Sequence, residues 1–583
     1  MLHTLTRSLR ENKGPALVTV LLSALEVVFE IVIPLFMSNL IDFGIEGGSM
    51  AAVWKFGAFL LLLAAFQLAT GVLAARIAAR ASVGFAANLR EDMYDNVQTF
   101  AFSNIDKFST ASIVTRLTTD TTNVQNAFQM LMRMAIRAPV MLVFSMVVSF
   151  RISHDISMTF LIILPILALA LFFIIRSVFP VFTRVFRTYD ELNNVVQENV
   201  RGIRVVKSFN QERHEIGKFG AISERIYKDF SKGERLITLN APLMQFCIYT
   251  CMIVISWLGA KAIIASGNDP ALGLTTGNLT ALITYTMQIL SSLMMLSMVF
   301  AMLTISLSSA RRIAEVLEER SDIPQPEQPV MTVRDGAVDF DHVSFVYASK
   351  ADKKVLDDID LHIRSGETIG IIGGTGASKS SLVQLIPRLY DVTGGKLTLG
   401  GVDVRDYDLD TLRGAVAMVL QKNELFSGTI KENLRWGNEN ATDEELQHAC
   451  VLACADEFIS AMPDGYDTHI EQGGTNVSGG QKQRLCIARA LLKKPKVLIL
   501  DDSTSAVDTR TDAQIQQALS TYIPDTTKII IAQRISSVQN ADRIVVLDDG
   551  HIDAVGSHDE LLRTCEIYRE VYESQQKGGE DDA

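Results

Sequence analysis

Residues 369–386 read IGIIGGTGASKSSLVQLI, an apolar run that enters a glycine-rich turn and leaves it with the spacing of a helix. In the pattern G-x-x-x-x-G-K-[ST], backbone amides hold phosphate groups, the lysine reaches the terminal phosphates and the hydroxyl binds Mg²⁺. Gly373, Lys379 and Ser380 match this pattern, whereas Ser378 stands where a glycine is usual. The stretch therefore predicts a strand, a phosphate-binding loop and a helix.

A second strand pattern, VLILDDSTSAVD at 497–508, places Asp501 at the end of an apolar run. A phosphate loop and a second strand-end carboxylate are the two elements that a magnesium–nucleotide site requires. Between them lies VSGGQKQR at 477–484, where a serine and two glycines precede a helical run. Such a segment is a second phosphate-binding surface. Because the chain already has a phosphate loop, this second surface indicates a site completed by another subunit.

The C-terminal half alternates short β-branched runs with helical stretches. The runs are IGIIG, VAMVL, VLILD, IIIA and RIVVL. This alternation predicts an α/β domain with a largely parallel sheet, which we place at 337–574. A proline-rich linker at 318–336 precedes it, and we expect a disordered acidic tail at 575–583.

The N-terminal part, residues 1–317, has the composition of a membrane domain. Six apolar stretches are long enough to cross a bilayer of roughly 30 Å as helices. They lie at about 16–38, 55–76, 131–150, 157–178, 241–264 and 279–304. A mean hydropathy of +0.22 fits such a domain joined to a soluble one. The formal net charge of −12 argues against a nucleic-acid partner.

The connections between these stretches differ in length and charge. Those after the second and fourth are long, have helical periodicity, and the second of them is rich in arginine and lysine. By the positive-inside rule, both long connections and both termini face the cytoplasm. We expect a multi-pass protein of a bacterial plasma membrane.

With these motifs the chain resembles the ATP-binding cassette (ABC) exporters, specifically half-transporters with six membrane helices fused to one P-loop nucleotide-binding domain. VSGGQ differs from the family signature LSGGQ only in its first residue. The resemblance implies ATP and Mg²⁺ as ligands and two cassettes that face head to tail. Each ATP then lies between one chain's P-loop and the other chain's signature.

The resemblance also assigns roles to individual residues. Tyr347 matches the aromatic residue that stacks on adenine, and Gln421 matches the glutamine that senses Mg²⁺ and contacts the membrane domain. Ser380, Gln421 and Asp501 are the expected Mg²⁺ residues. The remaining nucleotide-binding residues are Gly373, Gly374, Thr375, Gly376, Ala377, Ser378, Lys379 and Ser381; the signature facing the partner's ATP is Val477, Ser478, Gly479, Gly480 and Gln481; and the dimer-interface loop is Ser505, Ala506, Val507 and Asp508.

Three positions depart from the family's hydrolytic pattern. Asp502 stands where a glutamate acts as general base, and a carboxylate one methylene shorter reaches the attacking water poorly. Gln533 stands where a histidine contacts the γ-phosphate, and glutamine cannot carry its positive charge. Ser378 replaces a glycine, at a cost if that backbone needs φ > 0. The pattern predicts the degenerate, slowly hydrolysing site of a heterodimer; neutral drift and a homodimer are the alternatives.

Two further features concern coupling and cargo. The resemblance implies that the tips of the long connections are short coupling helices that dock on the cassettes, with candidates at 103–110 and 209–215.

In the first membrane helix, Glu26 and Glu30 share a face, and a charge at membrane depth usually faces the bundle interior or a wet cavity. They are candidates for binding cationic amphiphiles. The alternative is a lock against the partner or a bond to another helix through Gln245, Gln288 or Arg137.

The main prediction is ATP-driven export of small amphiphilic or hydrophobic substrates across the plasma membrane by one half of a heterodimer, with membrane lipid as a further partner. A lipid or peptide exporter would show the same motifs. A regulatory, ATP-binding membrane subunit is a third reading, which the intact signature disfavours. The six spans exclude a soluble ATPase. An importer is disfavoured because such proteins usually keep the membrane and ATPase parts on separate chains.

Overall fold

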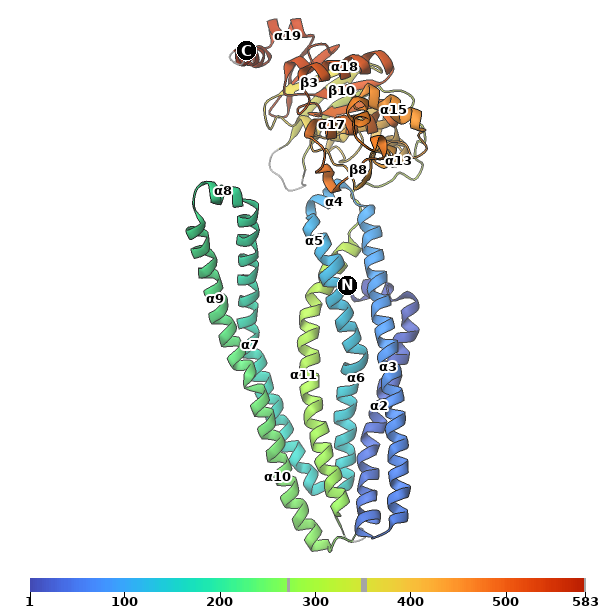
Figure 1. Cartoon of the computed structure of the whole chain (residues 1–583), viewed down its shortest axis with the longest axis vertical. Coiled ribbons are helices and arrows are strands. Elements are labelled where there is room, and N and C mark those ends of the chain that lie inside the picture. The colour runs from blue at the N-terminus through green and yellow to red at the C-terminus, as the bar shows by residue number, and fades with distance from the viewer. Residues whose placement is uncertain (270–272, 348–353, 581–583) are drawn as a thin grey trace. The chain divides into compact units, whose positions relative to one another are not determined.

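The computed structural model describes residues 1–269, 273–347 and 354–580 of the chain. The chain divides into two compact units. The first, helical unit contains residues 1–98 and 110–319, and the second contains residues 99–109 together with the C-terminal part from Arg320 onward. Figure 1 shows long helices in the first unit and mixed strands and helices in the second.

The helical unit is built from long helices joined by short turns. Its elements are α1 (Leu2–Arg7), η1 (Arg10–Asn12), α2 (Lys13–Asn39), η2 (Leu40–Glu46), α3 (Met50–Gln98), α5 (Thr110–Thr115), η3 (Arg116–Asp120), α6 (Thr121–Ile152), α7 (His154–Arg201), α8 (Ile203–Ser208), α9 (Glu212–Thr238), α10 (Asn240–Ser266) and α11 (Thr276–Glu318). Each of the six predicted spans lies inside one helix: α2, α3, α6, α7, α10 or α11.

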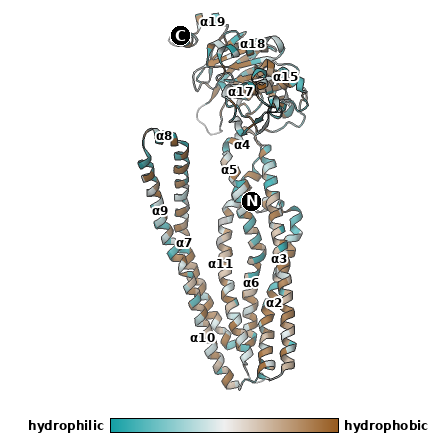
Figure 2. Ribbon diagram, viewed as in Figure 1, coloured by the Kyte–Doolittle hydropathy of each residue, from teal (hydrophilic) through white to brown (hydrophobic). Residues whose placement is uncertain are grey.

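Within the described residues, six helices are long and apolar enough to cross a membrane. Hydrophobic residues, coloured brown, recur along these helices in Figure 2. Several extend far beyond a membrane's thickness: α3 has 49 residues and α7 has 48, where about 20 suffice to cross the hydrocarbon core. The long connections are therefore helical, as their periodicity predicts.

The tips of the long connections differ from the expected coupling helices in one respect. The candidate at 103–110 overlaps a short helix, α4 (Phe102–Lys107). The candidate at 209–215 does not form a helix of its own: it contains the turn after α8 and the first residues of α9. Asn210 lies in the left-handed region at φ +51°, which interrupts the helix there. The short helix at this tip is α8, six residues upstream of the predicted start.

The C-terminal unit, which we call the cassette, contains three sheets in the described part of the chain. Their orders are β2-β1-β4-β5, β12-β11-β3-β10-β9-β6 and β7-β8. The strands are β1 (Val338–Phe345), β2 (Leu356–Ile363), β3 (Thr368–Gly373), β4 (Gly394–Leu399), β5 (Val402–Asp403), β6 (Val416–Val419), β7 (Gly428–Thr429), β8 (His469–Ile470), β9 (Val497–Asp501), β10 (Thr527–Ile531), β11 (Arg543–Asp548) and β12 (His551–Gly556).

Helices and short 3-10 turns connect these strands. They are α12 (Lys379–Leu385), η4 (Val404–Asp406), α13 (Leu409–Ala415), α14 (Ile430–Arg435), α15 (Asp443–Leu452), α16 (Asp456–Ser460), η5 (Gly465–Asp467), η6 (Gln472–Gly474), α17 (Gly479–Leu492), α18 (Thr509–Tyr522), η7 (Ile535–Ser537), α19 (His558–Thr564) and α20 (Glu566–Glu580). The predicted boundary at 574 falls inside α20, so the expected tail begins in a helix. Residues 581–583 lie outside the described part.

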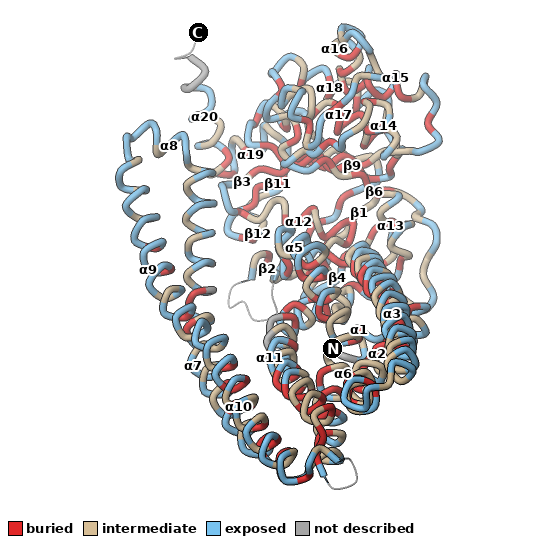
Figure 3. Tube along the Cα trace, turned by 60° about the horizontal axis from the view of Figure 1, so that its bottom comes forward, coloured by how far each residue is buried: buried red, intermediate tan, exposed pale blue. Residues whose placement is uncertain are grey.

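The large sheet has a hydrophobic core on each face. In β9, Val497 and Ile499 belong to one core, while Leu498 and Leu500 belong to the other. Buried residues follow strands β3, β9 and β11 of this sheet in Figure 3. A parallel strand that is covered on both faces needs an unbroken apolar run, which explains the sequence VLIL. The alternating element pattern thus predicted the α/β architecture correctly.

Candidate functional site

The site lies where four parallel strands end. Strands β3, β10, β9 and β6 are adjacent and run in one direction, so their carboxyl ends lie along the same edge of the sheet. The phosphate loop follows β3, Gln533 follows β10, Asp501 and Asp502 come at the end of β9, and Gln421 follows β6. Residues up to about 160 positions apart are thereby brought to one edge, which is where ligands bind in sheets of this type.

The phosphate loop enters the left-handed region of the backbone at two positions, Gly376 and Ser378. Ser378 lies at φ +67° and ψ +20°, in the left-handed region, immediately before α12. Gly376 also has a positive φ, and a side chain at Gly374 or Gly376 would meet nothing within 4 Å. Lys379 Nζ donates hydrogen bonds to the carbonyl oxygens of Gly373 (2.7 Å) and Gly374 (2.9 Å). The loop is therefore an open cradle, with its lysine held across it.

The carboxylate and hydroxyl expected to bind Mg²⁺ come together beside this loop. The Asp501 residue is 3% exposed, and burial raises the pKa of its carboxyl, while a hydrogen bond from Ser380 lowers it. Burial lowers the pKa of the Lys379 ammonium, and the charges of Asp501 and Asp502 oppose that shift. Oxygen ligands of this kind suit a hard cation such as Mg²⁺. Ser380 and Asp501 would hold the ion, with Gln421 on the adjacent strand end.

Two amides converge on one oxygen of Asp502. Gln533 Nε2 donates to Asp502 Oδ2 at 2.9 Å, and Gln421 Nε2 approaches the same oxygen at 3.4 Å. Asp502 itself lies at φ +47°, a strained conformation for a residue with a side chain. Two of the three positions that depart from the hydrolytic pattern, Asp502 and Gln533, therefore contact each other directly.

The signature segment forms the start of a helix. Ser478 is the N-cap of α17: its Oγ accepts from the Gln481 amide, and the Gln481 side chain accepts from the Ser478 amide. Such a capping box leaves the first amides of α17 directed outward, where they can bind an anion.

The signature helix is tied to the predicted dimer-interface loop. Gln483, in the second turn of α17, accepts from the Ala506 amide at 3.0 Å and donates to Ser505 Oγ at 3.2 Å. A side chain at Gly480 would lie 2.8 Å from the Ala506 carbonyl oxygen. Asp508 caps α18 by accepting from the Thr511 amide. Gln483 was not among the predicted site residues, although it lies two positions after the signature.

Aromatic residues connect the expected adenine contact with helix α4, which belongs to the cassette unit. Tyr347 follows β1, and its hydroxyl lies 2.7 Å from Ser381 Oγ. The rings of Tyr347 and Tyr390 meet edge to face at 5.1 Å. Tyr390 also donates to Asp106 Oδ2 of α4 at 2.8 Å and contacts Phe102. Burial and the Asp106 carboxylate raise the pKa of Tyr390.

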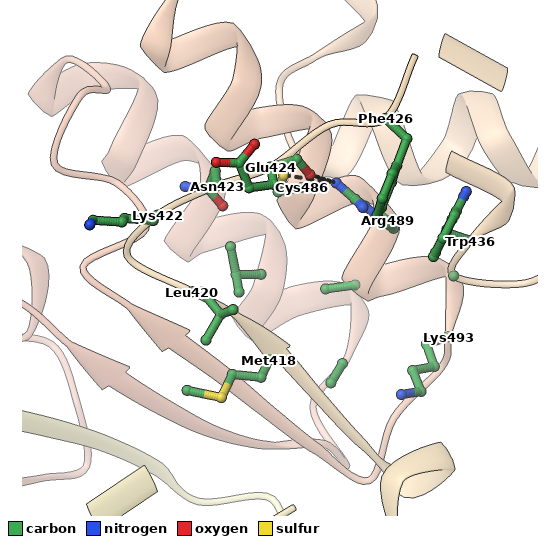
Figure 4. A pocket seen from close by; sticks show the side chains of 14 residues that line it. Met418, Leu420, Lys422, Asn423, Glu424, Phe426, Trp436, Cys486, Arg489 and Lys493 are labelled. Atoms are coloured by element: carbon green, nitrogen blue, oxygen red, sulfur yellow. Dashed lines mark hydrogen bonds between the residues drawn. The ribbon is translucent and has the colours of Figure 1, made fainter. Parts of the chain in front are cut away.

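A cavity of about 330 Å³ opens on the cassette next to Gln421 (Figure 4). Leu420 and Lys422 line it on one side, and the rings of Phe426 and Trp436 stack at 4.1 Å on the other. Both rings are largely exposed. The cavity is thus an apolar surface with basic residues that lies beside the strand end carrying Gln421.

In the helical unit, Glu26 and Glu30 share one partner. Arg137 of α6 donates to Glu26 Oε1 at 2.8 Å and to Glu30 Oε2 at 2.6 Å. Gln288 of α11 donates to the Glu30 carbonyl oxygen. The contacts correspond to the inter-helix bond among the alternatives, and they join α2 to α6 and α11.

Comparisons with known proteins agree on the class. Residues 16–294 match the ABC transporter transmembrane region, and residues 356–505 match the ABC transporter family. The chain is 36% identical over 558 residues to the uncharacterized ABC transporter ATP-binding protein YfiB of Bacillus subtilis, with 96% of each chain covered. It is 31% identical over 489 residues to an ATP-dependent lipid A-core flippase of Desulfotalea psychrophila, with 84% of each covered.

A solved structure of a bacterial Atm1-family ABC exporter with ATP bound shares the fold. Its TM-score is 0.79 at 24% identity, and the match covers 97% of this chain and 98% of that one. The six candidate spans and the bacterial relatives make this a multi-pass protein of a bacterial membrane. With membrane and ATP-binding parts on one polypeptide, the chain belongs to the ABC transporter family.

Proposed function

We propose that this chain is one half of a heterodimeric ABC exporter and that its own P-loop forms the degenerate ATP site. The observation that carries the proposal is the hydrogen bond from Gln533 to Asp502 Oδ2. Ser380, Lys379 and Asp501 keep the groups needed to bind Mg-ATP. The signature at 477–481 would complete a competent site on the partner's P-loop.

Three features of the site would slow ATP turnover. A general base must come within hydrogen-bond reach of the attacking water, and Asp502 is one methylene short for that role. Its Oδ2 also accepts from Gln533, so one lone-pair direction is already used. Glutamine remains neutral and adds no charge at the γ-phosphate. The site is thus suited to holding ATP more than to cleaving it.

Restoring both departures tests this function. In the assembled complex, with hydrolysis at the partner's site silenced, Asp502→Glu plus Gln533→His should raise ATP turnover at least about tenfold, because a placed general base contributes roughly 10²–10⁴. Phosphate release in reconstituted vesicles is the measurement. Asp525→Glu, the same change at an exposed position of the cassette, is the control and should change nothing.

Two outcomes would contradict the proposal. Unchanged turnover in the restored variant would mean that Asp502 and Gln533 do not limit hydrolysis. Purification of a fully active complex that contains only this chain would exclude the heterodimer, because both sites would then carry the same departures.

The serine in the phosphate loop gives a prediction about stability. Ser378→Gly should stabilise the nucleotide-free cassette by about 0.5–1 kcal/mol, because glycine adopts the left-handed region without a Cβ penalty. Ser381→Gly, inside α12, should destabilise it by a similar amount. Thermal unfolding of the two variants measures both effects. If both substitutions raised or both lowered the stability of the cassette, the backbone strain assigned to Ser378 would be contradicted.

The tips of the two long connections would couple ATP binding to the membrane helices. Within the cassette unit, Asp106 of helix α4 accepts a hydrogen bond from Tyr390, near the expected adenine contact. We place the second tip, α8 with the turn at 209–211, on the partner's cassette, where a cavity like that beside Gln421 would receive the exposed Phe209. ATP binding would then draw the cassettes together and shift the membrane helices between two access states.

Tyr390→Phe tests the first contact. The ring that faces Tyr347 is kept, while the hydrogen bond to the Asp106 carboxylate is lost. We expect ATP binding within twofold of the parent and transport per ATP reduced several-fold, since a net hydrogen bond to a charged group is worth roughly 1.5–3 kcal/mol. Tyr522→Phe at an exposed position of α18 is the control. Transport equal to the parent's would show that this contact does not couple.

We propose amphiphilic or hydrophobic compounds as the cargo. Substitutions in the cluster of Glu26, Glu30 and Arg137 test whether its carboxylates bind such a substrate. Two carboxylates and one guanidinium hold α2 against α6, so the cluster acts as a lock between helices. A lipid substrate is the second candidate, favoured by the relative named as a lipid A-core flippase.

We expect Glu26→Gln and Glu30→Gln each to lower export of cationic and neutral dyes equally. The double substitution should lower export by more than the two single substitutions combined, because it leaves the part-buried Arg137 guanidinium without either carboxylate. Dye efflux from cells that express the complex is the measurement. A loss confined to cationic dyes would instead identify the two carboxylates as the substrate site.

A further inference from the structure

A single side chain of the last helix holds the loop that carries Gln533. Gln575 of α20 accepts a hydrogen bond from the Ile535 amide at 2.9 Å. Its Nε2 donates to the Gln533 carbonyl oxygen at 2.8 Å. One amide group therefore satisfies a donor and an acceptor of the same loop, two residues apart.

The helix that presents Gln575 is fixed to the cassette core. Tyr568 is fully buried, and its hydroxyl lies 2.8 Å from His558 Nδ1. Val571 and Tyr572 pack against the same core. Positions 568, 571, 572 and 575 have the spacing of one helix face, so Gln575 is carried by the anchored side of α20. Packing therefore fixes the helix, and the exposed Gln575 side chain is held at the loop by its two hydrogen bonds.

The loop is held at both ends, and Gln575 acts between them. Gln533 comes two residues after Ile531, the last residue of β10, and Ile531 pairs with Asp501 in the parallel ladder. Beyond Ile535, which is buried, Ser537 donates to Asp512 Oδ2 at 2.6 Å. The backbone between these anchors sets the direction of the Gln533 side chain, which in turn contacts Asp502.

We propose that Gln575 is a positioning residue for the nucleotide site: through the backbone of Gln533 it sets how that side chain meets Asp502 and the terminal phosphate. The inference rests on the proposed function in one respect: it assumes that the Gln533 side chain faces the nucleotide. It adds α20, a segment that the sequence assigns to the domain's end, to the reaction site. Gln575 touches neither nucleotide nor reacting water in this role.

Hydrogen–deuterium exchange of the full-length complex without nucleotide tests the contact itself. Gln575→Leu keeps the size of the side chain and removes both hydrogen bonds, so exchange in the loop 533–537 should rise about fivefold to thirtyfold, the factor that one or two net hydrogen bonds are worth. Gln575→Glu keeps the acceptor for the Ile535 amide and should give a smaller rise. Gln576→Leu is the matched control, because Gln576 bonds only Tyr572 of its own helix among the contacts found. Unchanged exchange in Gln575→Leu, or an equal rise in Gln576→Leu, would overturn the inference.

A second readout separates positioning from a general structural role. In the variant with Asp502→Glu and Gln533→His, adding Gln575→Leu should lower kcat for ATP three- to tenfold and leave KM within twofold. Adding Gln576→Leu should change neither. A raised KM together with a lowered kcat would mean that the substitution disturbs the whole nucleotide site, which contradicts a positioning role. If the restored variant itself shows no turnover, the proposed function fails, while the exchange experiment still decides the role of Gln575.

Discussion

The parallel pairing of β3, β10, β9 and β6 is the constraint on which the cassette depends. Its strands are covered by hydrophobic cores on both faces, so their order and direction are set by burial. Because β10 lies between β3 and β9, the loop carrying Gln533 lies between the phosphate loop and Asp501. The chemistry of the site is thus a consequence of which strand ends are neighbours.

That arrangement also means that the side chains of Asp502 and Gln533, which both differ from the family's hydrolytic pattern, affect each other. A glutamine amide is a good donor to a carboxylate, and the two groups meet at 2.9 Å across adjacent strand ends. In the proposed degenerate site, changing only Gln533 would leave a carboxylate that is one methylene short of the attacking water. Changing only Asp502 to glutamate would leave the longer carboxylate against the same amide. The two positions therefore act as a unit, and their effects on turnover should not add.

Much of this could be predicted from sequence, because local patterns have local causes. Lys379 and Ser380 follow a strand and a glycine-rich turn, and the replacement of a glycine by Ser378 raised the question of a left-handed backbone, which the structure has there. Contacts between distant segments were harder to predict. Arg137 was one of three possible partners for Glu26 and Glu30, and only the packing of α2 on α6 selects it. The turn at Asn210 was missed because the surrounding periodicity is helical throughout.

Gln575 shows a different limit. Its sequence context, SQQKGGEDDA, has the composition of a disordered tail, and an amide that bonds only backbone groups leaves no pattern in the residues it contacts. The helix nevertheless continues, because Tyr568, Val571 and Tyr572 provide an apolar face that the cassette core covers. Tertiary packing, more than helix propensity, orders this segment. The same packing carries a polar side chain to the backbone of a loop about forty residues earlier in the chain, where it can act on the nucleotide site.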